Sequence, residues 1–148
     1  MIDLLPSITS VNTSVIYHRV TYSEVDRMSY VYYGNYTVWF EMGRTELLRE
    51  SGLTYKQIEE SGILLPVRKC NIRYHKPAKY DDYVSIATIV TSLKKASVVF
   101  MTAAYNEKNI LLVEGEVELA CTDKSGKPKA ITKNLADRLI CFMQDTVQ

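Results

Sequence analysis

The stretch that decides the fold is residues 35–50, which reads NYTVWFEMGRTELLRE. Its first half is apolar around most of a helical circumference, and its second half carries one apolar and one charged stripe. A helix that is apolar on most sides must be surrounded by other elements rather than rest on a surface. These 16 residues span roughly 24 Å as a helix, which is long enough to cross a small sheet. Gly52, just beyond the stretch, is typical of a helix end.

The segments on both sides of this helix have the composition and alternation of strands. One strand is predicted before it, at residues 14–22, and a short helix follows it at 54–61. Four further strands are predicted at residues 67–74, 83–93, 97–106 and 110–121. In the last of these, Glu114, Glu116 and Glu118 alternate with apolar residues, which predicts one buried face and one solvated face. A closing helix is expected over residues 132–143.

Together these elements predict an α+β protein of the hotdog fold, with a five-stranded antiparallel sheet wrapped around one long central helix. The sheet and the helix each bury their apolar face on the other. No linker, repeat or low-complexity segment divides the chain, so residues 1–148 are expected to form one domain, with residues 1–13 as a loosely held leader. Such a sheet has an open edge, and we therefore expect a homodimer or homotetramer.

Charge and cysteine content exclude several classes of function. The net charge of +1 argues against nucleic-acid binding, and no run approaches the roughly 18 apolar residues that a membrane span requires. Cys70, Cys121 and Cys141 are odd in number and form no CxxC pair, which indicates a reducing, cytoplasmic location rather than a disulfide framework. His18 and His75 have no clustered ligand partners, so no metal or other cofactor is expected.

Candidate chemistry lies just before the long helix, in residues 22–36, which read YSEVDRMSYVYYGNY. Free N–H groups at a helix amino terminus carry partial positive charge and stabilise a developing oxyanion. Asp26, placed beside such donors, would attack a thioester carbonyl or activate water. On the residues alone, however, an Asp in a loop before a helix is more often a turn or cap residue than a catalytic one. Glu41 interrupts the apolar half of the helix and is either solvated or a second catalytic carboxylate.

This segment resembles the active-site motif of the 4-hydroxybenzoyl-CoA thioesterase family, and most of all the short acyl-CoA thioesterases associated with the Tol-Pal system. The shared residues are Asp26, Val31, Tyr32, Tyr33, Asn35, Tyr36, Trp39, Phe40 and Arg44-Thr45-Glu46. A second shared segment is residues 72–82, IRYHKPAKYDD, and the similarity spans about residues 14–140. One departure is Ser29, where the family usually has Gly; if that position requires a positive φ, Ser adopts it at a cost.

The resemblance implies hydrolysis of an acyl-CoA thioester to a free acid and coenzyme A. It implies that Asp26 is the nucleophile or general base and that the backbone N–H of Tyr33 polarises the thioester carbonyl. It also places Lys94, Lys95 and Ser97 at the coenzyme A phosphates, often across a subunit interface. Without the resemblance, the lysine pair is equally typical of a solvated turn.

Three alternatives stay open at this point. Acyl carrier protein thioesters are a close variant of the substrate, because both carriers share the phosphopantetheine arm. A hotdog dehydratase would use an active-site histidine, but His18 and His75 lie outside the helix-start motif. A non-catalytic module that binds acyl-CoA or acyl carrier protein is disfavoured by Asp26, since binding alone needs no carboxylate near the carbonyl. The acyl group itself is not specified by the sequence.

Overall fold

The computed structural model describes residues 12–143, so most of the expected leader (residues 1–11) and residues 144–148 lie outside the described part. The elements, in chain order, are β1 (Ser14–Arg19), the short 3-10 helix η1 (Tyr22–Glu24), α2 (Asn35–Glu50), α3 (Tyr55–Glu60), β2 (Val67–Tyr74), β3 (Tyr83–Lys94), β4 (Ser97–Tyr105), β5 (Leu111–Ala120) and α4 (Lys133–Ile140). The predicted bounds of α2 and β2 are confirmed to the residue, and the other predicted elements are present with ends that differ by a few residues.

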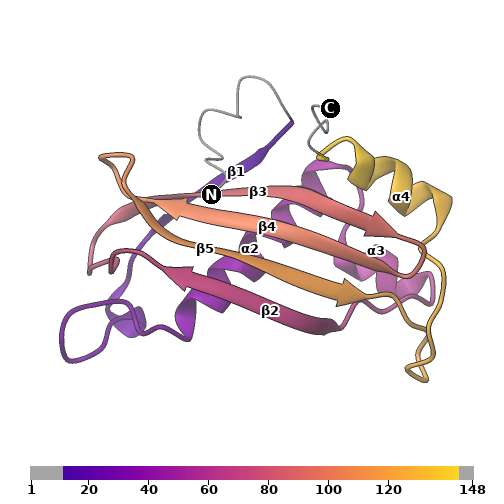
Figure 1. Ribbon diagram of the computed structural model, residues 1–148, viewed down its shortest axis with the longest axis horizontal. Coiled ribbons are helices and arrows are strands. Elements are labelled where there is room, and N and C mark those ends of the chain that lie inside the picture. Colours follow the sequence, from indigo (N-terminus) through magenta and orange to yellow (C-terminus); the bar gives the residue numbers. More distant parts are fainter. Residues whose placement is uncertain (1–11, 144–148) are drawn as a thin grey trace.

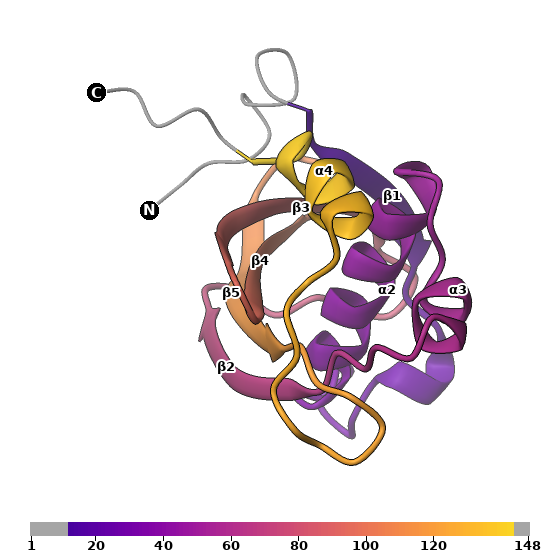
Figure 2. The same ribbon diagram turned by 90° about the vertical axis from the view of Figure 1, so that its right-hand side faces the viewer.

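The five strands form one sheet in the order β1-β3-β4-β5-β2, and every neighbouring pair is antiparallel. The sheet curves around α2, which lies along its concave face (Figure 2). This arrangement confirms the predicted five-stranded sheet of the hotdog fold. The remaining helices, α3 and α4, lie together near one end of the sheet (Figures 1 and 2).

The core lies between α2 and the concave face of the sheet, and two glycines set how closely they approach. The fully buried side chains of α2 are Trp39, Phe40, Leu47 and Leu48. Gly43 of α2 faces Thr88 of β3, and Gly115 of β5 faces the ring of Phe40. A Cβ added at Gly115 would lie 2.6 Å from Phe40 Cε2, which is closer than van der Waals contact.

The prediction of a solvated glutamate face on β5 is wrong at Glu114. Glu116 is exposed, but only 6% of Glu114 is accessible to solvent. Its same-face neighbours are Ala103 on β4 and Arg73 on β2, so the residue is flanked by strands on both sides. The Glu114 carboxylate lies 3.6 Å from His75 Nε2, just beyond the end of β2. Strand periodicity gives the face of a residue, whereas its burial depends on what the neighbouring strands place beside it.

The loops gather at two ends of the sheet, and these ends differ in content (Figure 1). One end carries the β1–α2, β2–β3 and β4–β5 connections, together with the amino terminus of α2. The other end carries the β3–β4 hairpin, α3 and α4. Within the described residues, no helix is long and apolar enough to cross a bilayer.

Candidate active site

The loop between β1 and α2 is anchored by the side chain of Glu24. Its carboxylate accepts hydrogen bonds from the Trp39 indole (2.7 Å) and the backbone N–H of Thr21 (2.9 Å). It also lies 2.7 Å from His18 Nε2. Burial raises the pKa of Glu24, but the hydrogen bonds from Trp39, Thr21 and His18 outweigh it and hold the pKa below the ordinary value of 4.5. Glu24 is therefore held as a carboxylate that ties β1, the loop and α2 together.

The backbone carbonyl of Glu24 fixes the start of α2. It accepts hydrogen bonds from Asn35 Nδ2 and from the Tyr32 N–H, each at 2.8 Å. The loop between these residues must then turn within a short length of chain, with Val25 bridged to Val31.

Asp26 lies at the turn of this loop. Its Oδ1 accepts the backbone N–H groups of Met28 (2.8 Å) and Tyr30 (3.3 Å). Its Oδ2 accepts no hydrogen bond from any described residue. The turn requires φ = 64° at Ser29, the position at which the sequence departs from the family's usual Gly. The carboxylate is thus held by one oxygen, and the other is available to a substrate or to water.

The amino terminus of α2 lies beside Asp26 and carries no side-chain cap, because the N-cap residue is Gly34. Among residues 12–143, the N–H groups of Tyr33 and Gly34 donate to no acceptor. Tyr33 as a whole is 62% exposed to solvent. Uncapped N–H groups at a helix start attract negative charge, such as a developing oxyanion.

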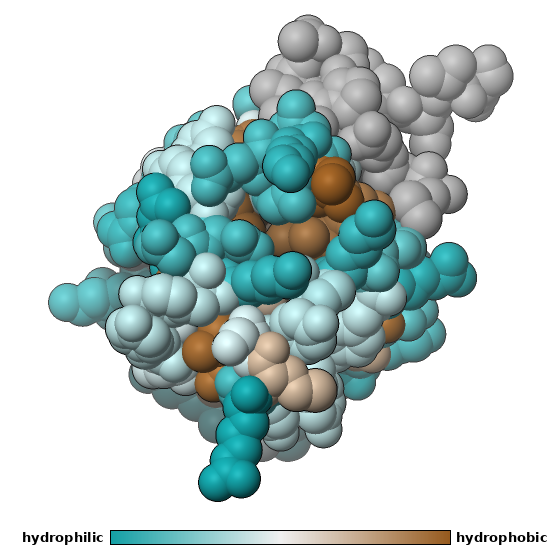
Figure 3. All heavy atoms as spheres, turned by 90° about the vertical axis from the view of Figure 1, so that its left-hand side faces the viewer, coloured by the Kyte–Doolittle hydropathy of each residue, from teal (hydrophilic) through white to brown (hydrophobic). Residues whose placement is uncertain are grey.

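Asp26 and Tyr33 line the same cleft, which has a volume of about 400 Å³. Its other lining residues are Met28, Tyr30, Val31, Tyr36, Tyr74, His75, Lys76 and Pro77. Figure 3 looks at this end of the molecule, where small hydrophobic patches are scattered among hydrophilic and intermediate side chains. The Tyr74 ring packs against Tyr33 and Tyr36, with centroids 6.4 Å and 5.6 Å apart, so one wall of the cleft is aromatic.

The second shared segment of the sequence, residues 72–82, also lines this cleft, through Tyr74, His75, Lys76 and Pro77. The Ala78 carbonyl accepts the Val31 N–H at 2.8 Å, and the Ala78 N–H donates to Tyr36 Oη at 3.1 Å. Burial raises the pKa of Tyr36, which keeps its hydroxyl protonated at neutral pH. The Pro77–Ala78 loop is therefore clamped between the Asp26 loop and α2.

Lys94, Lys95 and Ser97 lie at the other end of the sheet, in the β3–β4 hairpin (Figure 1). Both lysines are exposed, whereas Ser97 is buried and pairs with Lys94 in the hairpin. Strand β3 has 12 residues, so at about 3.3 Å per residue the hairpin is roughly 36 Å from the cleft end. Within one chain, these three residues are not brought together with Asp26 and Tyr33.

Sequence reasoning left the position of Glu41 open and did not identify the role of Glu24. Glu41 is exposed and does not line the cleft, so it occupies the solvated position rather than that of a second site carboxylate. The anchor Glu24 was missed, together with its partners His18 and Trp39. A signal was present, because Thr21 and Glu24 have the Thr-x-x-Glu spacing of a capping box, and the structure forms that box. Within residues 12–143, no three His, Cys, Asp or Glu side chains converge as metal ligands.

Comparison with known proteins gives a consistent result. Residues 28–113 match the family model of the thioesterase superfamily. The acyl-CoA thioester hydrolase YbgC of Escherichia coli O157:H7 is 35% identical over 118 residues, which cover 79% of this chain and 88% of that protein. The acyl-CoA thioesterase YbgC of Haemophilus influenzae is 32% identical over 119 residues, which cover 79% of this chain and 87% of that protein.

Solved structures share the fold over most of the chain. The DHNA-CoA thioesterase of Staphylococcus aureus superposes with a TM-score of 0.79 at 31% identity, covering 84% of this chain and 85% of that one. A hypothetical protein of Thermus thermophilus superposes with a TM-score of 0.82 at 26% identity, covering 87% and 98% of the two chains.

Proposed function

We propose that this chain, which belongs to the thioesterase superfamily, hydrolyses acyl-CoA thioesters to a free carboxylic acid and coenzyme A. The observation that carries the proposal is the pairing of a carboxylate with free amides in one cleft. Asp26 offers Oδ2, and the uncapped start of α2 offers the Tyr33 N–H. A thioester carbonyl lying between them meets an electron-pair donor on its carbon and a hydrogen-bond donor on its oxygen.

The reaction then has two routes that use the same geometry. In one, Asp26 removes a proton from water as the water oxygen bonds to the carbonyl carbon. In the other, the Asp26 oxygen itself bonds to that carbon, and water later hydrolyses the resulting anhydride. In both, the Tyr33 N–H stabilises the negative charge on the carbonyl oxygen. The C–S bond breaks as this charge returns to the carbonyl, which in the second route is the step that forms the anhydride, and the departing thiolate of coenzyme A takes up a proton.

We propose further that the chain acts as a homodimer joined along β2. This strand ends the sheet, and all of its residues except Ile72 are exposed. An exposed, unpaired edge of eight residues is a template for another strand. Two β2 strands paired antiparallel about a two-fold axis would continue the sheet from one copy into the other.

This pairing supports a role for the distant lysines. Antiparallel pairing of β2 reverses the second copy, so its β3–β4 hairpin end lies at the cleft end of the first. The strand order places β3 of the second copy four strand spacings from β2 of the first, which is roughly 19 Å at about 4.8 Å per spacing. We therefore propose that Lys94, Lys95 and Ser97 bind coenzyme A phosphates held at the neighbouring subunit's cleft. A further pairing of dimers into a homotetramer is compatible with this arrangement.

The remaining parts of the proposal concern the setting of the reaction. Acyl carrier protein thioesters would enter the same cleft through the shared phosphopantetheine arm. A cytoplasmic location is consistent with Cys70, Cys121 and Cys141, which are all free thiols. Residues 1–148 form one domain in this proposal.

Turnover by the purified protein tests the proposal directly. Acyl-CoA thioesters from acetyl to palmitoyl, with an aromatic example, are incubated with the protein, and the released thiol is measured with a thiol-reactive dye. We expect release of one thiol per acid formed, and a sedimentation mass near twice 16.9 kDa. Saturable binding of acyl-CoA without release of thiol would instead establish the non-catalytic binding module.

A further inference from the structure

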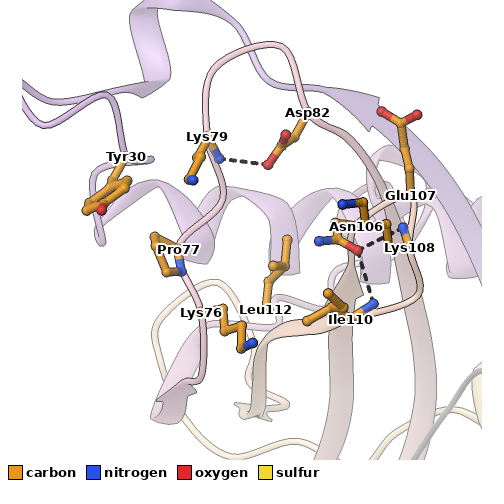
Figure 4. A pocket seen from close by; sticks show the side chains of 10 residues that line it. All are labelled: Tyr30, Lys76, Pro77, Lys79, Asp82, Asn106, Glu107, Lys108, Ile110 and Leu112. Carbon is orange, nitrogen blue, oxygen red and sulfur yellow. Dashed lines mark hydrogen bonds between the residues drawn. The ribbon is translucent and has the colours of Figure 1, made fainter.

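A second pocket, of about 500 Å³, adjoins the cleft. Tyr30, Lys76 and Pro77 line both cavities, so these three side chains form the boundary between them. The pocket lies between the β2–β3 connection and the β4–β5 turn (Figure 4). It is the size of an ordinary small-molecule site, and neither Asp26 nor Tyr33 lines it.

Three lysines give this pocket its character. Lys76 and Lys79 come from the β2–β3 connection, and Lys108 comes from the β4–β5 turn. None of these three ammonium groups forms an ion pair with a carboxylate of residues 12–143. Two separate loops thus bring three unpaired ammonium groups to one cavity.

The two acidic side chains of the pocket are already engaged. Asp82 Oδ2 accepts the backbone N–H of Lys79 at 2.8 Å, which shapes the β2–β3 connection (Figure 4). Glu107 Oε1 accepts the Tyr83 N–H at 3.2 Å and lies 3.9 Å from Arg19 Nη1. Neither carboxylate is paired with a lysine of the pocket, and Arg19 offsets the charge of Glu107.

A neutral donor completes the set. Asn106 Oδ1 accepts the backbone N–H groups of Lys108 (2.9 Å) and Ile110 (3.0 Å), which fixes the β4–β5 turn (Figure 4). This bonding leaves the Nδ2 donors of Asn106 without an acceptor in the described chain. Ammonium and amide donors without acceptors are the groups that bind oxyanions.

We infer that this pocket binds an anionic group of the thioester substrate, either a carboxylate at the far end of the acyl group or a phosphate of the carrier arm. The inference rests on the proposed function, because that function places the thioester carbonyl between Asp26 and Tyr33. Two arms leave the thioester, one on each side of the carbonyl. An arm that passes Tyr30 and Pro77 leads out of the cleft and onto the three lysines.

The test uses three substrates and one set of variants. Hexanoyl-CoA and adipoyl-CoA have acyl chains of equal length and differ in a terminal carboxylate, and hexanoyl-pantetheine lacks the phosphates altogether. Lys76→Gln, Lys79→Gln and Lys108→Gln are made singly and as a triple variant. The control is Lys133→Gln, which changes an exposed lysine on α4 at the other end of the molecule. Circular dichroism checks that each variant is folded.

Each source of the anion predicts a different pattern of KM changes across the three substrates. If the pocket binds an acyl carboxylate, the triple variant raises KM for adipoyl-CoA about tenfold or more and leaves hexanoyl-CoA within twofold. If it binds a carrier phosphate, KM rises equally for both CoA thioesters and stays unchanged for hexanoyl-pantetheine. Equal KM values in the triple variant, the Lys133 control and the wild type would overturn the inference, as would an equal rise in KM for all three substrates.

The proposed function is judged separately in the same experiment. Hydrolysis of hexanoyl-CoA by the wild type supports that function whatever the lysine variants do. If the wild type hydrolyses none of the substrates, the proposed function fails, and titration calorimetry with coenzyme A and with adipate still tests the pocket. Weaker binding of either anion by the triple variant than by the wild type would then retain the anion site, and equal binding would remove it.

Discussion

The α-helices at the two ends of the sheet begin in opposite ways. At the end that carries α3 and α4, both helix starts are capped by threonine: Thr54 accepts the Gln57 N–H in a full capping box, and Thr132 accepts the Leu135 N–H. At the other end, α2 begins after Gly34 with no side-chain cap. The longest helix of the described chain is therefore the one whose amino terminus is left open.

The difference shows where backbone hydrogen-bonding capacity is kept for a ligand. Uncapped N–H groups reduce helix stability, and a cap is worth about 1 kcal/mol. The capped end has its donors satisfied internally and serves to close the core. The open end keeps the Tyr33 amide free beside Asp26 and tolerates a positive φ at Ser29. Loss of local stability at a functional site is a common exchange in enzymes.

The largest expected effect is at the open end, in Asp26→Asn. The change keeps the shape and the hydrogen bonds to Oδ1 while removing the basic lone pair. Turnover of acyl-CoA should fall by about 10²–10⁴ or more, with binding and folding retained. Steady-state kinetics and acyl-CoA titration measure both. If Asp26 were only a turn residue, Asn would serve almost as well and turnover would stay normal.

Glu41→Gln is the matched control for Asp26, because Glu41 is an exposed carboxylate on α2, the helix that follows the Asp26 loop, and does not line the cleft. It should leave turnover unchanged. Normal turnover in the Asp26 variant with loss in the Glu41 variant would move the chemistry onto the helix surface.

A smaller effect is expected from the opposite end, in the double change Lys94→Ala and Lys95→Ala. The two contacts with phosphate, screened by solvent because both lysines are exposed, are together worth roughly 1.5–3 kcal/mol, so KM for acyl-CoA should rise about tenfold to a hundredfold. The KM for a pantetheine thioester should not change. Lys124→Ala with Lys127→Ala, two exposed lysines of a neighbouring loop, is the control. A rise in KM for both substrates would contradict phosphate binding by Lys94 and Lys95.

Glu24→Gln tests what holds the open end in place. Loss of charge-assisted hydrogen bonds should lower the free energy of unfolding by about 1.5–3 kcal/mol, measured in urea at pH 7. Because the folded pKa of Glu24 is lowered, its stabilisation is present above the ordinary value of 4.5 and is lost as pH falls through the folded value. The variant should therefore lose less stability than the wild type on acidification below that value. Glu60→Gln, an exposed glutamate of α3, should change neither quantity.

Thr54→Ala tests the capped end. It removes the cap of α3 and should cost about 1 kcal/mol of unfolding free energy. Turnover should stay within twofold of the wild type, because α3 lies away from the cleft. A loss of turnover larger than the loss of folded protein would show that this end also participates in the reaction.

The smallest effect is expected from Ser29→Gly. Relief of the left-handed conformation gains about 1–2 kcal/mol, and the greater freedom of Gly in the unfolded chain takes back about 0.5–1 kcal/mol. The net gain in thermal unfolding measurements should be about 0–1.5 kcal/mol, with turnover retained. A clear destabilisation would mean that the Ser29 side chain has a role that its backbone conformation does not explain.

The parts of the fold that were predictable from sequence depend on local signals. The bounds of α2 follow from its apolar circumference and from Gly52, which adopts φ = 93° after the helix. The burial of Glu114 was not predictable, because it depends on β2 and β4, which lie beside β5 only in the folded sheet. Strand alternation carries no information about neighbours from distant parts of the chain.

The candidate site likewise has one part that was predictable from the sequence and another that was not. The placement of Asp26 before the start of α2 was readable from residues close in sequence, and the structure places it in one cleft with Tyr33. The clamp between Ala78 and Tyr36 joins residues 42 positions apart, so no local pattern reports it. The roles of Lys94, Lys95 and Ser97 depend on a second copy of the chain and remain predictions.

The close approach of Gly115 to Phe40 limits how this protein could acquire new substrates. A methyl group at residue 115 would meet the Phe40 ring and the Asn71 carbonyl at once, so the ring, and with it α2, would have to move away from the sheet. Phe40 lies one helical turn beyond Tyr36, and Tyr36 holds the Ala78 loop of the cleft. Changes in the core of the sheet would thus disturb the cleft between Asp26 and Tyr33 before they reshaped the space for an acyl group. Adaptation to other acyl groups is left to the exposed rim, where Met28 and Tyr30 can vary without moving the helix.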